Sequence, residues 1–194
     1  MTMIGKMRIN RLFPIILIFL VGCEIGGNKT QNSTSPTYIT VNNRDYFFNV
    51  DTLLKGAHSY IHIVMYEMTN SSDSLSKIEL LKRDLINKAQ ADVDVKVILE
   101  HSGDNYSLNS YNSDAKTYLE GGGVKVVFDS DAITTHSKLI IVDGRVIVIG
   151  STNWSTSAIE YNNETSIMID DENIASIYEN YFENLWLNYG GSSD

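Results

Sequence analysis

His136 and Lys138 stand two residues apart, directly before a run of apolar residues at 139–142. Side chains two apart on a β-strand point to the same face, so an extended segment would place the imidazole beside the ammonium. A neutral imidazole nitrogen can attack phosphorus, and a fixed cation can hold the non-bridging oxygens of a phosphate. The pair therefore predicts nucleophilic chemistry on a phosphate ester.

Further polar residues follow at short range. Ser151 and Asn153, in Gly150-Ser151-Thr152-Asn153, offer a hydroxyl, an amide and backbone N–H groups to the same phosphate oxygens. Glu164 and Asp143 are carboxylates available to orient an imidazole, as the acidic member of a catalytic triad does. A histidine and a lysine alone would be an ordinary exposed strand face, so the prediction depends on the complete set.

The spacing of these residues resembles the signature of the phospholipase D superfamily: His136-x-Lys138, then Asp143, then Gly150-Ser151-x-Asn153. Glu164 also fits the small members of that family, and the resemblance extends more loosely over about 46–187. It implies that His136 is the nucleophile and forms a phosphohistidine, that Lys138 and Asn153 bind the phosphate, and that Ser151 and Glu164 support the site. Asp143 fits a structural role better than contact with substrate.

A second histidine is needed to protonate the leaving alkoxide and then to activate water. Large members of the family carry two copies of the motif, whereas this chain carries one. Small members pair two identical chains, so the resemblance implies a homodimer with a shared site.

Helical and strand patterns alternate along the chain. Helices are expected near 46–57, 75–90, 111–120 and 171–187, and strands at 60–66, 93–99, 124–128, 138–142, 145–149 and 165–169. Asp143-Gly144 is a strong hairpin signal, and Gly121-Gly122-Gly123 is a helix stop. The order predicts an α/β fold: a mixed β-sheet with helices on both faces, as in a phospholipase D-like domain.

The first residues carry three positive charges (Lys6, Arg8, Arg11) and lead into an apolar run at 12–22 that stops at Cys23. Eleven helical residues at ~1.5 Å each cannot cross a hydrocarbon core of ~30 Å, so the segment is typical of a secretory signal. Leu20-Val21-Gly22-Cys23 resembles the lipobox of bacterial lipoproteins, which implies cleavage before Cys23 and lipid on its thiol. The alternative is a buried free cysteine in an uncleaved signal anchor.

Residues 24–36 are rich in Gly, Asn, Ser and Thr and lack an apolar period. The predicted organisation is a signal peptide at 1–22, a flexible tether at 23–37 and a catalytic domain at 38–190. The predicted location is the exported side of a bacterial cell envelope, with the chain held to a membrane by lipid.

The formal net charge is −9, from 24 acidic and 15 basic residues, and removal of the three leader cations would make it −12. An acidic body resists non-specific contact with polyanions such as nucleic acid. Cys23 is the only cysteine, which excludes an internal disulfide and a cysteine-based zinc cluster.

No metal or other cofactor is predicted. His58 and His62 would lie over ~13 Å apart on a strand, too far to share a metal ion, and no acidic cluster completes a site in the sequence. His101 follows a predicted strand and either lines the mouth of the site or faces solvent, the latter being favoured. Trp154 and Tyr161 fit stacking on substrate and core packing equally well.

Three functions fit the sequence. The favoured one is a phospholipid headgroup hydrolase held at a bilayer, where that substrate is concentrated. The second is a non-specific endonuclease, which the small single-motif architecture favours. The third is a surface lipoprotein that binds without cleaving, which the complete motif disfavours.

Overall fold

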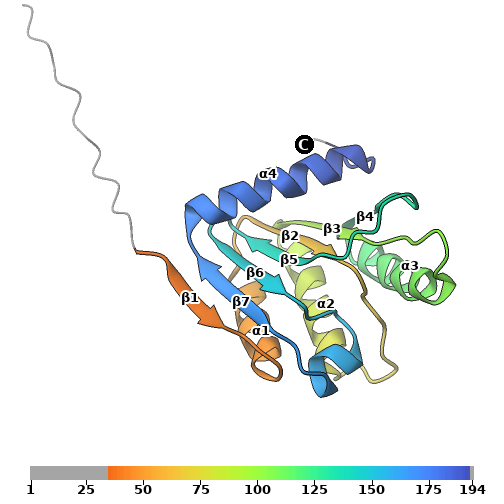
Figure 1. The fold of residues 1–194 in the computed structure, drawn as a ribbon, viewed down its shortest axis with the longest axis horizontal. Coiled ribbons are helices and arrows are strands. Elements are labelled where there is room, and N and C mark those ends of the chain that lie inside the picture. Colours follow the sequence, from red (N-terminus) through yellow and green to blue (C-terminus); the bar gives the residue numbers. More distant parts are fainter. Residues whose placement is uncertain (1–34, 193–194) are drawn as a thin grey trace, which may run out of the picture. The chain divides into compact units, whose positions relative to one another are not determined.

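The computed structural model describes residues 35–192, whose strands form one seven-stranded sheet (Figure 1). Residues 1–34, with the predicted signal peptide, Cys23 and most of the predicted tether, lie outside the described residues. The elements in chain order are β1 (Thr37–Thr40), α1 (Asp45–Gly56), β2 (Tyr60–Met65), α2 (Lys77–Ala89), β3 (Asp94–Leu99), α3 (Tyr106–Gly121), β4 (Lys125–Phe128), β5 (Lys138–Val142), β6 (Val146–Gly150), a short π-helix η1 (Ser157–Tyr161), β7 (Ser166–Asp170) and α4 (Glu172–Asn188).

The strand order is β1-β7-β6-β5-β2-β3-β4. Strands β2, β3 and β4 are parallel, and every other neighbouring pair is antiparallel. The ends of β2, β3, β4 and β6 therefore meet the beginnings of β5 and β7 at one end of the sheet. This end carries His136 and is called the His136 end below.

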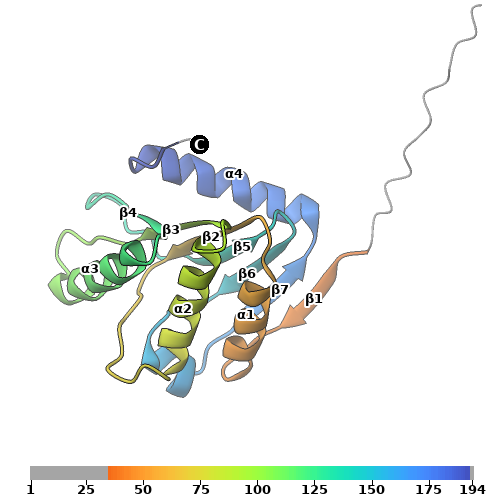
Figure 2. The same cartoon turned by 180° about the vertical axis from the view of Figure 1, so that it is seen from behind.

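Helices cover both faces of the sheet (Figures 1 and 2). Helices α1, α2 and α3 pack on one face over the larger apolar core, and α4 packs on the other face against β2, β5 and β6. The predicted fold class, a mixed sheet flanked by helices on both faces, is confirmed. Among the described residues, no helix combines the length and the apolar composition needed to cross a bilayer.

Side-chain caps set where the helices begin. Ser76, Asn105 and Asp171 each accept hydrogen bonds from N–H groups in the first turn of α2, α3 and α4. The helix expected at 111–120 begins earlier, at Tyr106, because Asn105 caps a first turn that has little apolar pattern. It ends at Gly121, as the glycine run predicts.

The β5–β6 hairpin turns at Asp143 and Gly144, whose φ angles of 53° and 63° are those of a type I′ turn. This confirms the hairpin signal. Two elements were not predicted: β1, a short exposed edge strand, and the π-helix η1.

Candidate active site

His136 and Lys138 lie at the His136 end of the sheet, beside the end of β2. Lys138 is the first residue of β5 and is the register partner of Met65. The Tyr66 ring lies 4.4 Å from the His136 ring, centroid to centroid, and 4.7 Å from Lys138 Nζ. Lys138 Nζ also donates to the His136 carbonyl oxygen at 2.9 Å. The two side chains therefore share one face, as their spacing predicts.

The two side chains differ in access to solvent. His136 is exposed, whereas Lys138 is 6% exposed. A substrate can thus reach the imidazole, while the ammonium is held in place beneath it. An immobilised cation in a partly buried position stabilises added negative charge better than a mobile surface lysine does.

The surroundings of His136 favour its neutral form. Burial lowers the pKa of His136, and the positive charge of Lys138 lowers it further. Burial also lowers the pKa of Lys138, opposed by the charges of Glu164, Glu67 and Glu100. The imidazole is therefore available as a nucleophile over a wider range of pH than an ordinary histidine.

Ser151 and Glu164 join the end of β6 to the beginning of β7. Ser151 Oγ donates to Glu164 Oε2 and accepts from Thr165 N at 3.0 Å. Asn162 Nδ2 donates to Glu164 Oε1 at 3.0 Å, and Glu164 N donates to Asn43 Oδ1 at 2.7 Å. The Glu164 carboxylate thus orients Ser151 in this structure, and its effect on Lys138 is electrostatic.

Gly150 and Asn153 complete the motif. A Cβ atom at Gly150 would lie 2.2 Å from Ser166 Oγ and 2.3 Å from Thr165 O, so only glycine allows β6 and β7 to approach here. Asn153 Oδ1 is buried and has no hydrogen-bond partner among residues 35–192. An amide oxygen cannot bind phosphate oxygens, which are themselves acceptors, so the predicted role of Asn153 in phosphate binding would fall to its Nδ2 donor and stays a prediction.

Asp143 lies just beyond the opposite end of β5, about 17 Å from Lys138 by the rise of a strand. Its carboxylate accepts backbone N–H groups of His58 at 2.9 Å, Ser59 at 2.7 Å and Tyr60 at 3.0 Å. Burial acts to raise the pKa of Asp143, but these backbone hydrogen bonds outweigh it and lower the pKa. The possible role of Asp143 in orienting the imidazole, and its place among the predicted catalytic residues, were therefore wrong. Asp143 anchors the loop between α1 and β2, which agrees with the structural role that was favoured for it.

The other histidines lie apart from His136. His58 is exposed in the α1–β2 loop. His62 is buried, and its Nδ1 lies 2.7 Å from Glu179 Oε1 and 3.9 Å from Glu183 Oε1 on α4. The expectation that no acidic cluster adjoins His62 was therefore wrong, because α4 brings in residues remote in sequence. Lys96 already pairs with Glu183 at 3.4 Å, so an ammonium neutralises part of this cluster.

His101 and the two aromatic residues beside the motif have distinct surroundings. His101 Nδ1 lies 2.7 Å from Asp131 Oδ1, near the His136 end. Trp154 is fully buried and its Nε1 donates to the Tyr46 hydroxyl at 3.1 Å, so it is a core residue. Tyr161 is exposed on η1.

Three residues near the site were not predicted: Tyr66, Glu100 and Asn112. Asn112 of α3 is fully buried; it donates to the carbonyl oxygens of Tyr66 and Glu100 at 2.8 Å each and accepts from Met68 N at 2.8 Å. It thereby joins the ends of β2 and β3. The one available signal was an asparagine on the apolar face of a helix.

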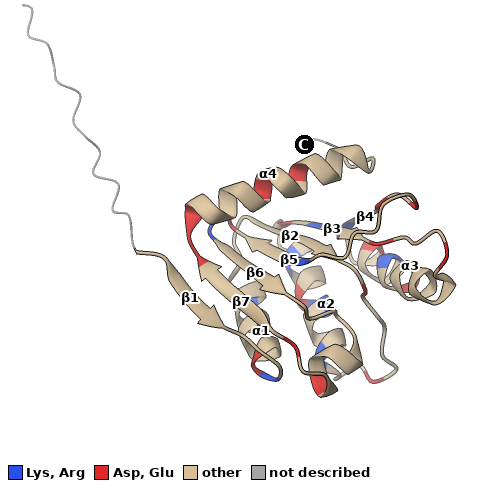
Figure 3. Ribbon diagram, viewed as in Figure 1, with Lys and Arg blue, Asp and Glu red and all other residues tan. Residues whose placement is uncertain are grey.

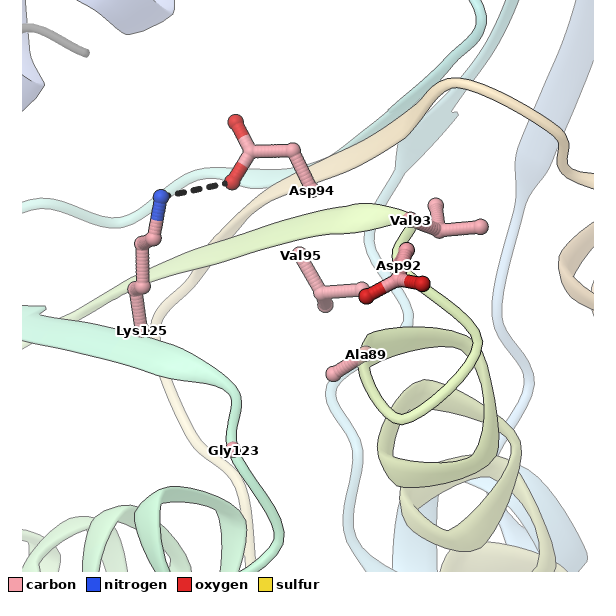
Figure 4. A pocket seen from close by; sticks show the side chains of 7 residues that line it. All are labelled: Ala89, Asp92, Val93, Asp94, Val95, Gly123 and Lys125. Atoms are coloured by element: carbon pink, nitrogen blue, oxygen red, sulfur yellow. Dashed lines mark hydrogen bonds and ion pairs between the residues drawn. The ribbon is translucent and has the colours of Figure 1, made fainter.

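The amino ends of α2 and α3 also face the His136 end, because each helix follows a strand that ends there. Helix amino ends favour bound anions. A pocket of about 350 Å³ lies at the other end of the sheet, beside Asp94 and Lys125 at the beginnings of β3 and β4 (Figure 4). It is separate from the residues that suit phosphate chemistry.

Comparison with known proteins gives the family. The family model described as "Cardiolipin synthase, PLD-like domain" matches residues 50–186, well over half of the chain. The chain belongs to the phospholipase D superfamily. This confirms the resemblance seen in the motif.

Two relatives with known names are similar to this chain over about two thirds of its length. The chain is 32% identical over 136 residues to a mitochondrial cardiolipin hydrolase of Xenopus laevis, which covers 70% of this chain and 59% of that protein. It is 30% identical over 131 residues to a phospholipase D of Rickettsia typhi, which covers 66% of this chain and 57% of that protein. The chain thus spans a little over half the length of these superfamily relatives.

Solved structures show the same fold. The phospholipase D family member Nuc from Salmonella typhimurium has a TM-score of 0.67 at 20% identity, covering 79% of this chain and 95% of that one. NucT from Helicobacter pylori has a TM-score of 0.63 at 19% identity, covering 80% and 98%.

Proposed function

We propose that this chain hydrolyses phosphodiester bonds through a covalent phosphohistidine on His136. The observation that carries the proposal is the exposed His136 imidazole beside the buried Lys138 ammonium, within a complete superfamily motif. Membership of a superfamily whose matched relatives are named as hydrolases of phospholipids supports it.

The reaction takes two displacements. A His136 ring nitrogen attacks phosphorus, a P–N bond forms, and the bond to the leaving oxygen breaks. Lys138 and Asn153 stabilise the charge that develops on the phosphate oxygens. Water then attacks phosphorus, the P–N bond breaks, and the imidazole is regenerated.

The leaving oxygen needs a proton, and the activation of water needs a base. His58 and His62 do not serve, because one lies at the opposite end of the sheet and the other lies under α4. The second histidine in the proposal is His136 of a second copy, in a two-fold homodimer. A two-fold axis apposes the same surface on both subunits, so it can bring both imidazoles to one phosphate.

The proposed substrate is a phospholipid headgroup. The loops at the His136 end carry exposed carboxylates, among them Asp73, Asp104 and Asp131, and Figure 3 shows acidic residues along these loops. A polynucleotide lays several phosphates across a surface and needs several cations to bind them. A headgroup presents one phosphodiester at a time to Lys138 and avoids most of this repulsion.

The substrate test compares vesicles of phosphatidylcholine and of cardiolipin with plasmid and single-stranded DNA, all in excess EDTA. Headgroup release should exceed DNA cleavage and should disappear in His136→Ala, which controls for contaminating enzymes. Retention of activity in EDTA is expected because the proposed steps use protein groups alone. Faster cleavage of DNA than of phospholipid would identify the protein as an endonuclease. Cleavage of none of these substrates would favour the third function, a surface lipoprotein that binds without cleaving.

Lipid attachment at Cys23, and with it a location on the exported side of a bacterial envelope, is part of the same proposal. It rests on Leu20-Val21-Gly22-Cys23 after a basic, short apolar leader. Cys23→Ser should move the protein out of the membrane fraction or leave it as a precursor. Normal processing with full membrane retention in this variant would contradict lipidation.

A further inference from the structure

Two buried carboxyl groups lie side by side where β3 and β4 end. Glu100 follows β3 and Asp129 follows β4, and the preceding residues, Leu99 and Phe128, are register partners. Glu100 is 1% exposed and Asp129 is 8% exposed. Neither residue belongs to the superfamily motif described above.

Glu100 holds the segment that carries His136. Thr135 N donates to Glu100 Oε2, and Thr135 is itself buried. On the other side of His136, Tyr66 N donates to the Ser137 carbonyl oxygen at 3.0 Å. The backbone is thus fixed on both sides of the exposed imidazole, by β2 through Ser137 and by Glu100 through Thr135.

The β3–β4 register brings the two buried carboxyl groups together at the ends of neighbouring strands. Two ionised carboxylates can only accept hydrogen bonds and would repel each other, whereas one proton between them would supply a donor. Asp129 Oδ1 accepts from His101 N at 2.6 Å, whereas Asp129 Oδ2 is buried and meets no N–H or O–H donor in the described part of the chain. A proton shared between the two carboxyl groups would supply the donor that Asp129 Oδ2 lacks.

We infer that Glu100 is a positioning residue for the proposed hydrolase: the proton-sharing Glu100–Asp129 pair holds the β4–β5 loop so that His136 stands beside Lys138. Neither carboxyl touches substrate. Loss of the shared proton to solvent would leave two buried carboxylates in contact, and their repulsion would release Thr135 and with it His136.

The local electrostatics place this event near neutral pH. Burial raises the pKa of Glu100 to about 7, and the hydrogen bond to Asp129 and its charge act in the same direction. The Thr135 N–H and His101 act in the opposite direction, and Lys138 on β5 is the other charged group that faces Glu100. From α3, Glu100 meets the uncharged Asn112, which binds its carbonyl oxygen.

The activity test is a pH profile of kcat with bis(4-nitrophenyl) phosphate, a chromogenic phosphodiester. In the wild type, loss of one proton from the pair should reduce kcat by about tenfold per pH unit above about pH 7. In Glu100→Gln the amide can accept from Thr135 and donate to Asp129 at every pH, so this decline should disappear. Glu100→Ala should be slow throughout, and Glu120→Gln, an exposed carboxylate on α3, should keep the wild-type profile.

A second measurement needs no activity. In NMR of protein with ¹³C-labelled glutamate, the Glu100 carboxyl should titrate near pH 7, and the His136 backbone amide should shift over the same range. In Glu100→Gln both changes should be absent.

The outcomes separate the two proposals. Titration of Glu100 near its ordinary pKa would overturn the shared proton. If the chemical shift of the His136 backbone amide does not change over this pH range, Glu100 does not position His136. The same conclusion would follow if the decline of kcat at alkaline pH persists in Glu100→Gln. A wild-type protein that cleaves no phosphodiester would overturn the proposed function, while the NMR titration would still decide the role of Glu100.

Discussion

Lys138 acts on His136 in two ways at the scale of single residues. In the proposed mechanism it supplies the fixed cation for the phosphate, and its charge adds to burial in lowering the pKa of His136, the proposed nucleophile. A protonated imidazole has no lone pair for attack, so a lowered pKa extends the active range toward acid pH. The same contact thus serves binding and nucleophilicity.

The lowered pKa of His136 predicts how kcat/KM depends on pH on the acid side of the profile. In the wild type kcat/KM should rise with pH as His136 loses its proton, with a midpoint below 6.5. Lys138→Met should move the midpoint up toward 6.5 and lower the maximal rate by about 10²–10³-fold. Single-turnover rates across pH measure both, with the exposed Lys55→Met as the control. An unchanged midpoint would show that the two side chains do not interact.

Asp143 should matter for stability and not for chemistry. Asp143→Ala leaves three backbone N–H groups without their acceptor, so the free energy of unfolding should fall by about 2 kcal/mol at pH 7. Because the pKa of Asp143 is lowered in the fold, its contribution is present above its unfolded pKa of 3.8 and is lost as the pH falls through its folded pKa. Urea unfolding measures the difference, which should shrink below pH 3.8. If fully folded Asp143→Ala protein lost its activity, Asp143 would have a catalytic role after all.

At the scale of elements, α3 contributes the contact that joins two strand ends beneath the site. Asn112 satisfies backbone groups of Tyr66, Met68 and Glu100 at once, at a position that is fully buried. Asn112 thus adds a side-chain link to the β2–β3 ladder, in which Glu100 N also donates to the Met65 carbonyl oxygen at 3.3 Å.

Asn112→Leu keeps the branching at Cγ, adds some bulk, and leaves three buried backbone groups unsatisfied. The free energy of unfolding should fall by about 3 kcal/mol or more, since each orphaned group costs about 1–3 kcal/mol. Ser110→Ala, on an exposed position of the same helix, should change it by less than about 0.5 kcal/mol. Urea denaturation of both variants gives the comparison. A small loss in Asn112→Leu would mean that these groups find other partners.

Strand alternation and turn chemistry are local, and they predicted β5, its hairpin at Asp143-Gly144 and the shared face of His136 and Lys138. The parts of the site that were not predicted depend on which strands become neighbours in the sheet. Glu100 and Asp129 meet only because β3 and β4 pair in parallel, and a single sequence does not contain that register. Strand β1 was also missed. It has four residues, all exposed, so it shows no apolar alternation that would predict a strand.

At the scale of the whole molecule, the proposed mechanism requires two chains for one site. In mixtures of wild-type and His136→Ala chains at fixed total protein, a mixed dimer has one histidine and should be inactive. If subunits exchange freely, activity should fall as the square of the wild-type fraction. A straight line under proven exchange would mean that each chain works alone.

The most direct test of the central claim is capture of the phosphohistidine. Protein mixed with bis(4-nitrophenyl) phosphate and quenched in denaturing alkali, which preserves the P–N bond, is digested and analysed by mass spectrometry. The peptide that contains His136 should gain the 4-nitrophenyl phosphoryl group, and His58→Ala should gain it equally. In His136→Ala the adduct should be absent, and turnover should fall well beyond the ~10²–10⁴-fold typical of losing acid–base catalysis alone. An adduct on another residue, or turnover that survives in His136→Ala, would contradict the mechanism.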